Sequence, residues 1–353
     1  MSNPTSSSTR HIGNGPAQLV AAPLIWYARC PTLTAVGLVA NRGVFQREFL
    51  RENVHMVSVR ENSTPSVRQG LLDHSLNNLI READAATSLW SHGLNGQSRL
   101  LALGRTFHSV SVVTRPGQAL SGLGDLVGRR LSVPKEAGNF SPAQVRALRA
   151  WGSILASSSV TARDVEFVPI VADHPSVPFG DIARREIEAL LSGQMDVALL
   201  FGAKGLELVQ HHNLCEIHRF SAEDIRKDSR LSGLVELRAL TADSVLIEGC
   251  EDIVTRITGV LLEASHWASN FPKEAVKQAA IEAKVEIGDA ATAYGSLLAT
   301  SAGLDLSTEN LLALTGLQTW LKARQLVPDS HQIDSWLRPE ILLAARKNRH
   351  LVA

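Results

Sequence analysis

Short apolar runs typical of β-strands alternate along this sequence with runs typical of α-helices, and this alternation limits the possible folds most strongly. In βαβ units the strands run parallel and helices cover both faces of the sheet. The expected strands are 24–27, 54–59, 99–103 and 109–114 in a first unit, and 130–134, 165–171 and 196–201 in a second. Helices are expected at 32–42, 142–156 and 182–192.

The chain is also long enough for two lobes. A length of 353 residues exceeds what one hydrophobic core usually fills. Residues 234–246 are extended again after the second unit, and the remainder has helical spacing. We therefore predict an α/β protein in which two extended segments join two lobes, as in a clamshell, with a helical C-terminal segment.

Charge and composition exclude several classes of partner. Lys+Arg 35 balances Asp+Glu 35, which argues against broad nucleic-acid or anionic-membrane binding. The first residues are polar, the first apolar stretch begins at Leu19 as an expected strand, and no run reaches the length of a membrane span. The sequence thus predicts a cytoplasmic protein. GLGDLVGRR lacks both the P-loop and the Rossmann spacing, so no nucleotide cofactor is expected.

One cysteine has an unusual setting. The chain has 3 Cys, with no metal-ligand spacing, so neither a disulfide framework nor a metal site is expected. In YARCPTLTA, a helix over 32–42 places Pro31 at its first position and Cys30 at its N-cap. A sulfur there would have a lowered pKa and favour the thiolate. The alternative is a small buried hydrophobic side chain, which is the role expected of Cys215 and Cys250.

A polar stretch, HSLNNLIREAD, supplies further candidates. It contains His74, two asparagines and Arg81 within a few residues. A histidine near a cysteine can act as its base, and an arginine fork suits an oxyanion. The alternative is a solvated loop leading into a helix, with Arg81, Glu82 and Asp84 facing water.

Four segments resemble the 2′-hydroxybiphenyl-2-sulfinate desulfinase family. They are YARCPTLTA, HSLNNLIREAD, DLVGRRLSVP with its later partner DVEFVPI, and LLALTGLQTWLKARQLVPDSHQIDSWLRPEIL. The resemblance covers about residues 24–350. It implies the two-lobed fold of the type II periplasmic binding proteins, close to the nitrate, sulfonate and taurine solute-binding proteins.

The resemblance also implies site residues. The family's essential cysteine falls on Cys30, its active-site histidine on His74 and its sulfinate-binding arginine on Arg81. In place of the family's glycine pair this chain has Ala83 and Asp84, so a carboxylate would lie near an anionic ligand unless it turns away or pairs with Arg81.

The same resemblance implies the lobe boundaries. The chain is expected to cross to the second lobe near Val112 and to return near Leu240, which gives a first lobe of 1–112 and 240–353 and a second of 113–239. Phe201, at the end of an expected strand, is expected to line the substrate pocket.

These expectations lead to a function and to alternatives. The resemblance implies a hydrolase that releases sulfite from an aromatic or other organic sulfinate, with no metal or organic cofactor. Cys30 would act either as a thiolate attacking sulfur or as a thiol protonating the ring carbon, with His74 orienting it. The first alternative is a non-catalytic protein that binds a small sulfonate, sulfinate or other anion. An enzyme acting on a carboxylate or a nitrile is a second.

Overall fold

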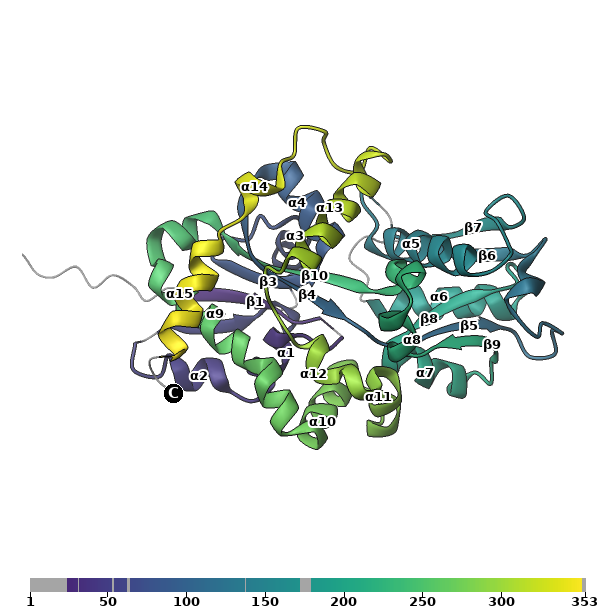
Figure 1. Cartoon of the computed structure of the whole chain (residues 1–353), viewed down its shortest axis with the longest axis horizontal. Helices are drawn as coiled ribbons and strands as arrows, with labels where there is room; N and C mark the ends of the chain where they lie inside the picture. The colour runs from purple at the N-terminus through teal and green to yellow at the C-terminus, as the bar shows by residue number, and fades with distance from the viewer. Residues whose placement is uncertain are drawn as a thin grey trace, which may run out of the picture.

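The computed structural model describes residues 24–30, 32–52, 54–61, 64–136, 138–171 and 179–350. Figure 1 shows two lobes side by side, each with strands at its centre, and the C-terminal helices packed mainly on the larger lobe. The expected part of the first strand at 19–23, and Pro31, lie outside the described residues.

The larger lobe contains a mixed five-stranded sheet. β1 pairs in parallel with β2 and β3, whereas β10 runs antiparallel to both β3 and β4. Along the sheet the order is β2 (His55–Ser58), β1 (Leu24–Ala28), β3 (Leu79–Asp84), β10 (Glu236–Asp243) and β4 (Ser98–Thr106). The expectation of a wholly parallel sheet is therefore wrong at β10, the strand that returns from the second lobe.

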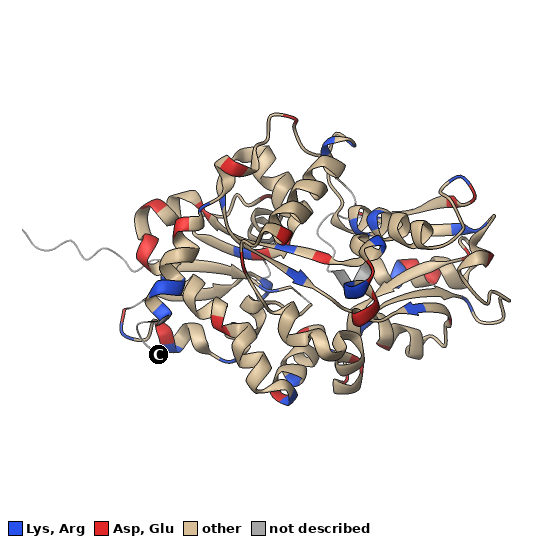
Figure 2. Ribbon diagram, in the orientation of Figure 1, with Lys and Arg blue, Asp and Glu red and all other residues tan. Residues whose placement is uncertain are grey.

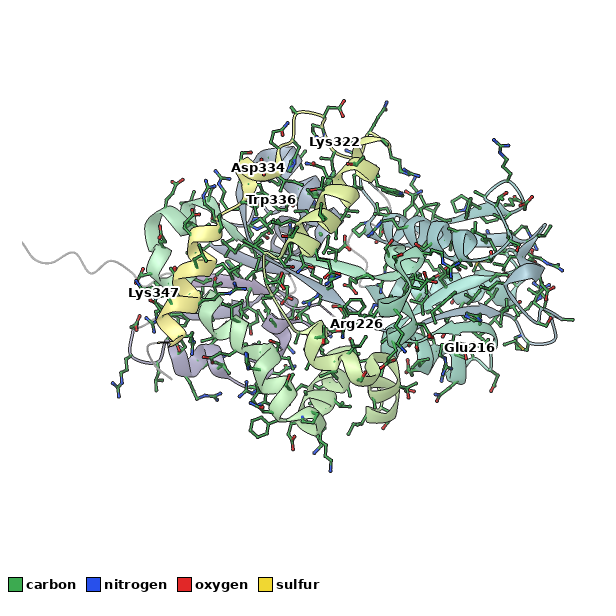
Figure 3. The ribbon with its side chains drawn as sticks, viewed as in Figure 1. Glu216, Arg226, Lys322, Asp334, Trp336 and Lys347 are labelled. Atoms are coloured by element: carbon green, nitrogen blue, oxygen red, sulfur yellow. The ribbon has the colours of Figure 1, made fainter. Side chains whose placement is uncertain are left out.

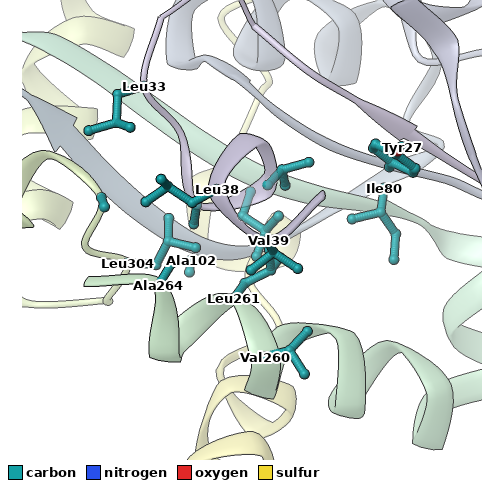
Figure 4. Close-up of a cluster of buried hydrophobic side chains, with 14 of the residues drawn as sticks. Tyr27, Leu33, Leu38, Val39, Ile80, Ala102, Val260, Leu261, Ala264 and Leu304 are labelled. Atoms are coloured by element: carbon teal, nitrogen blue, oxygen red, sulfur yellow. The ribbon is translucent and has the colours of Figure 1, made fainter. Parts of the chain in front are cut away.

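Helices cover both faces of this sheet, as expected. The segments between its strands are α1 (Ala35–Asn41), α2 (Val44–Glu48), η1 (Val59–Glu61), α3 (Pro65–Asp73) and α4 (Ala85–Asn95). Gly43 has a φ of 64°, and its N–H bonds the carbonyl of Ala40, so it ends α1 as its spacing predicts. Figure 4 shows part of the core on the α1 face, where Leu38 and Val39 lie near Leu261 and Ala264 of α9.

The smaller lobe is built from residues between β4 and β10. Its strands are β5 (Val110–Thr114), β6 (Arg130–Lys135), β7 (Glu166–Val171), β8 (Ala198–Phe201) and β9 (Cys215–Phe220). β5 lies antiparallel between β8 and β9, and β6 pairs in parallel with β7. The expectation that residues 109–114 form a parallel strand of the first unit is therefore wrong, because β5 belongs to the sheet of the second lobe. Its other elements are η2 (Leu123–Leu126), α5 (Pro142–Ser157), α6 (Phe179–Leu191), α7 (Gly202–His211), α8 (Ala222–Lys227) and η3 (Ser229–Leu234).

Two segments connect the sheets of the lobes. By sheet membership they are residues 107–109, between β4 and β5, and 221–235, between β9 and β10. The expected crossing points, Val112 and Leu240, therefore fall inside strands β5 and β10, a few residues beyond these connections.

The C-terminal segment is helical, and it begins directly after β10. Its elements are α9 (Ser244–Asn270), α10 (Pro272–Ala283), α11 (Ile287–Tyr294), η4 (Gly295–Leu297), α12 (Leu298–Ser301), α13 (Thr308–Lys322), α14 (Ile333–Trp336) and α15 (Pro339–His350). None of the described helices is both long and apolar enough to cross a membrane. Figure 3 shows Trp336 within this segment; its indole N–H donates to Ser98 Oγ, which fixes the segment to β4.

Candidate functional site

Cys30 lies in the loop between β1 and α1, but it does not cap the helix. The N-cap is Thr34, whose hydroxyl accepts a hydrogen bond from the Gly37 N–H at 2.9 Å. A hydroxyl is a better cap than a thiol, so α1 begins later than the spacing predicts. The half-buried Cys30 instead donates its S–H to the carbonyl oxygen of Glu82, with Sγ and O 3.3 Å apart.

The environment of Cys30 favours the thiol over the thiolate. Burial, reinforced by the negative charge of Glu236, raises the pKa of the thiol to about 12. The positive charge of Arg238 acts in the opposite direction but does not outweigh them. Because Thr34 caps α1, the predicted helix-terminal position of the sulfur is wrong, and the raised pKa favours the protonated thiol at neutral pH.

A buried ion pair lies behind the Cys30 loop. Glu82 on β3 and Arg238 on β10 are both fully buried and paired with each other. A second oxygen of Glu82 accepts the Val36 N–H at 2.9 Å, so this carboxylate also satisfies a donor in the first turn of α1. Gly104 on β4 makes room for the pair, because a Cβ there would lie 2.8 Å from Arg238 Nη2.

Arg81 points to the opposite face of β3 and is buried with an exposure of 1%. Its Nη1 donates to the carbonyls of Leu71 and Leu72 at 2.6 and 2.9 Å, at the end of α3. Its Nη2 donates to Ser91 Oγ at 2.8 Å and lies 3.4 Å from Ser88 Oγ, both on α4. The guanidinium thus ties α3 to α4. The alternative in which Arg81 and Glu82 face water is wrong.

His74 lies next to Arg81. It ends α3 in the left-handed region, with a φ of 58°, and its Nε2 lies 3.2 Å from Thr241 Oγ1. Burial and the neighbouring charge of Arg81 lower its pKa well below the usual range, so the ring is neutral. Among the described residues His74 makes no hydrogen bond with Cys30, so the structure does not form the direct orienting contact that was expected.

Asp84 turns toward the start of α4. Its carboxylate accepts the N–H groups of Ala86 and Thr87 at 2.8 and 3.3 Å, as an N-cap. Burial and the charge of Glu236 raise its pKa above the usual range. Asp84 was expected either to turn away from an anionic ligand or to pair with Arg81. The structure shows the first arrangement, because the carboxylate points to the amides of α4. Among the described residues Asp84 forms no ion pair with Arg81.

Residues from both lobes meet beside Cys30. Glu236 begins β10, His108 lies in the connection to β5, and Arg146 lies on α5. Arg146 Nη2 is 3.0 Å from His108 Nε2 and 3.7 Å from Glu236 Oε2. Phe201, half-buried at the end of β8, lies under the Arg146 guanidinium at 4.0 Å. Figure 2 shows red and blue segments adjoining along β10 and at the nearby part of α5.

Glu236, His108 and Arg146 were missed because they come together only in the fold, whereas Phe201 was among the expected residues. Although burial raises the pKa of Glu236, the Arg146 charge and the His108 hydrogen bond outweigh it, and the pKa is lowered. One signal was present: Glu236 and Arg238 alternate within the apolar run LVELRAL, where a strand would not otherwise carry charge. The described residues contain no group of three or more His, Cys, Asp or Glu side chains arranged to hold a metal ion.

Comparison with known proteins identifies the fold. No protein-family model and no curated protein matches the sequence. Among solved structures, the chain has the fold of the desulfurization enzyme DSZB and of sulfonate-binding proteins, which is the periplasmic-binding-protein fold that the family resemblance implies. This similarity spans nearly the whole length of both kinds of protein.

Three of these structures illustrate the range. A cysteine-to-serine mutant of the enzyme DSZB, in complex with biphenyl-2-sulfinic acid, is 20% identical with a TM-score of 0.73, over 92% of this chain and 99% of that one. The alkanesulfonate-binding protein SsuA from Xanthomonas axonopodis pv. citri, bound to MOPS, is 15% identical with a TM-score of 0.62, over 90% and 99%. Another SsuA, from Escherichia coli, is 10% identical with a TM-score of 0.61, over 90% and 92%.

Proposed function

We propose that this protein is a desulfinase-like enzyme that cleaves the C–S bond of an aromatic or other organic sulfinate. The observation that carries the proposal is the half-buried Cys30 thiol, which donates to the Glu82 carbonyl oxygen beside a group of charged residues from both lobes. The arginines of this region suit an acid group, and Phe201 offers a ring face for an organic part. The shared fold with a sulfinate-bound desulfinase supports the same assignment.

The state of the thiol favours one of the two chemical routes. A thiol whose pKa is about 12 is a poor source of thiolate at neutral pH, which disfavours attack on sulfur. The same thiol holds a proton that it can donate. We therefore assign Cys30 the role of proton donor to the ring carbon that bears sulfur.

This route needs no reactant besides the sulfinate and water, and its protons and electron pairs balance at each step. The Cys30 S–H proton goes to the ring carbon, and a π pair of the ring forms the new C–H bond. The C–S bond then breaks, and its electron pair restores the aromatic system as sulfur dioxide leaves. Water converts sulfur dioxide to hydrogen sulfite and a proton, and the thiolate recovers a proton from solvent. His74 is neutral and makes no hydrogen bond with Cys30 among the described residues, so this route assigns it no proton transfer.

The test is sulfite release from benzenesulfinate and biphenyl-2-sulfinate. The parent should release sulfite and the corresponding arene in equal amounts, and Cys30→Ser should release neither. Cys215→Ser is a matched control, because Cys215 is exposed on β9 and distant in the fold from the Cys30 loop. Unchanged turnover by Cys30→Ser would overturn the proposal.

One observation favours a second function, non-catalytic binding of an organic sulfonate or sulfinate. Asp84 accepts the amides of Ala86 and Thr87 at the start of α4, so these two donors are not free to stabilise a developing oxyanion. The fold is also that of proteins described as sulfonate-binding. Saturable binding of these anions with no sulfite release from the parent would identify this second function.

A further inference from the structure

Three positions where an anion could meet donors of the larger lobe are already occupied by the chain itself. Arg81 gives its terminal nitrogens to two carbonyls and two hydroxyls. Asp84 takes the amides at the start of α4, and Glu82 takes the Val36 amide in α1. A ligand acid group that replaced any of these contacts would leave a buried polar group unpaired, which opposes binding at these positions.

The smaller lobe, in contrast, presents a free arginine. Arg149 follows Arg146 by one helical turn on α5, and residues three apart lie on the same face of a helix. It is half-buried, and its guanidinium forms no hydrogen bond or ion pair with any described residue. Its donors are therefore available for a ligand.

Packing places this face of α5 toward the candidate site. Val145, one turn before Arg149, belongs to the same buried cluster as Ala85 and Ala86 at the start of α4. Phe140, just before α5, stacks on Trp90 of α4 with ring centroids 4.9 Å apart. Arg149 also interacts electrostatically with Asp84, the N-cap of α4. Arg146, on the same helix, reaches Glu236 beside Cys30.

We propose that Arg149, with Arg146 one turn before it, binds the acid group of the ligand in place of Arg81; this inference rests on the proposed function for the class of ligand. The planar guanidinium of Arg149 matches the two oxygens of a sulfinate or sulfonate in a bidentate arrangement. The ligand acid would then lie between α5 and the Asp84–Cys30 edge of the larger lobe. It would join the two lobes through its charge, and its organic part would lie toward Phe201.

Titration calorimetry with benzenesulfinate and benzenesulfonate tests the inference. Arg149→Gln should weaken binding of both anions at least tenfold, and Arg149→Lys should weaken it less, because the charge remains but the fork is lost. Arg163→Gln, an exposed arginine of the same lobe, is the control and should bind as the parent does. Arg81→Lys should lower the melting temperature and leave the affinity of the folded protein within about twofold.

The outcomes separate this inference from the proposed function. Anion binding that depends on Arg149 without sulfite release would support the inference and remove the desulfinase assignment. If the parent releases sulfite but Arg149→Gln binds the anions as tightly as the parent does, the desulfinase assignment is supported and the inference about Arg149 is overturned. The inference is also overturned if a folded Arg81→Lys protein loses affinity for the anions and Arg149→Gln does not. It is overturned as well if the parent binds neither anion.

Discussion

The Sγ of Cys30 and the carbonyl oxygen of Glu82 lie 3.3 Å apart, so the thiol is a donor to the backbone of the neighbouring strand. The side chain of the same Glu82 points the other way, to Arg238 and the first turn of α1. One residue of β3 thus fixes both the proton of the cysteine and the helix that follows it.

Cys30 should react slowly with alkylating reagents at neutral pH. Because burial and the Glu236 charge raise the pKa of its thiol to about 12, the thiolate fraction should grow about tenfold per pH unit from pH 7 to 10. The measurement is the rate of iodoacetamide labelling in a Cys215→Ser, Cys250→Ser background. The control is the same chain unfolded in urea, whose labelling rate should stop rising with pH above the ordinary thiol pKa of about 8.5. A plateau near pH 8 in the folded protein would contradict the prediction.

Loss of Arg238 should destabilise the protein strongly. Arg238→Met leaves the Glu82 carboxylate buried without its partner, which costs about 3–5 kcal/mol of unfolding free energy. Urea unfolding at pH 7 measures this change. The control is Arg230→Met, which removes the exposed pair with Asp228 and should change stability by about 0.5 kcal/mol or less. If both substitutions lower the unfolding free energy equally, the buried pair contributes no more to stability than the exposed pair does.

The fold could be predicted from the sequence because local patterns determine it. The strands and helices that were expected lie within a few residues of their predicted places, and Gly43 ends α1 as its position indicates. β3, which carries Arg81 and Asp84, was not expected as a strand, because its sequence LIREAD is too polar to be distinguished from a loop. The antiparallel course of β10 was not predicted, because the direction of a returning strand depends on its partners and not on its own pattern. Cys215 was expected in the interior but is exposed on β9.

The site could be predicted only in part, for the same physical reason. Resemblance named Cys30, His74, Arg81 and Asp84, and the structure places all four around β3. Their partners are distant in the chain, so spacing alone misjudged the state of the thiol. An ion pair such as the one Glu82 forms is invisible until the fold brings its partner close.

Glu186 should make stability depend on pH between about 4.5 and 7. This carboxyl on α6 is buried, with Ser132 as its hydrogen-bond partner, and burial raises its pKa from 4.5 to about 7. A raised carboxyl pKa means that the folded state binds the proton more tightly, so stability is lost as pH rises through this window. The shift corresponds to about 3 kcal/mol.

Glu186→Gln tests this dependence, because the amide is neutral and keeps an oxygen for Ser132. The variant should be more stable than the parent by about 2–3 kcal/mol at pH 8, and the difference should vanish near pH 4.5. Urea unfolding at a series of pH values measures it. Glu188→Gln, an exposed position on the same helix, should follow the parent curve throughout. A constant difference between Glu186→Gln and the parent at every pH would contradict the assignment.

Replacing Asp84 should increase affinity for small anions. Asp84→Gly removes a carboxylate that faces Arg149 across the lobes and frees the amides of Ala86 and Thr87 for an oxyanion. A favourable helix N-terminus contributes about 0.3–1 kcal/mol, so benzenesulfinate should bind about 2- to 5-fold more tightly by titration calorimetry. Asp84→Asn keeps an N-cap and removes only the charge, so its gain in affinity should be smaller. Replacing Asp by Gly at an N-cap lowers stability by only a few tenths of a kcal/mol, so both variants should remain folded. If both bind the anion no more tightly than the parent, the carboxylate of Asp84 does not oppose the ligand.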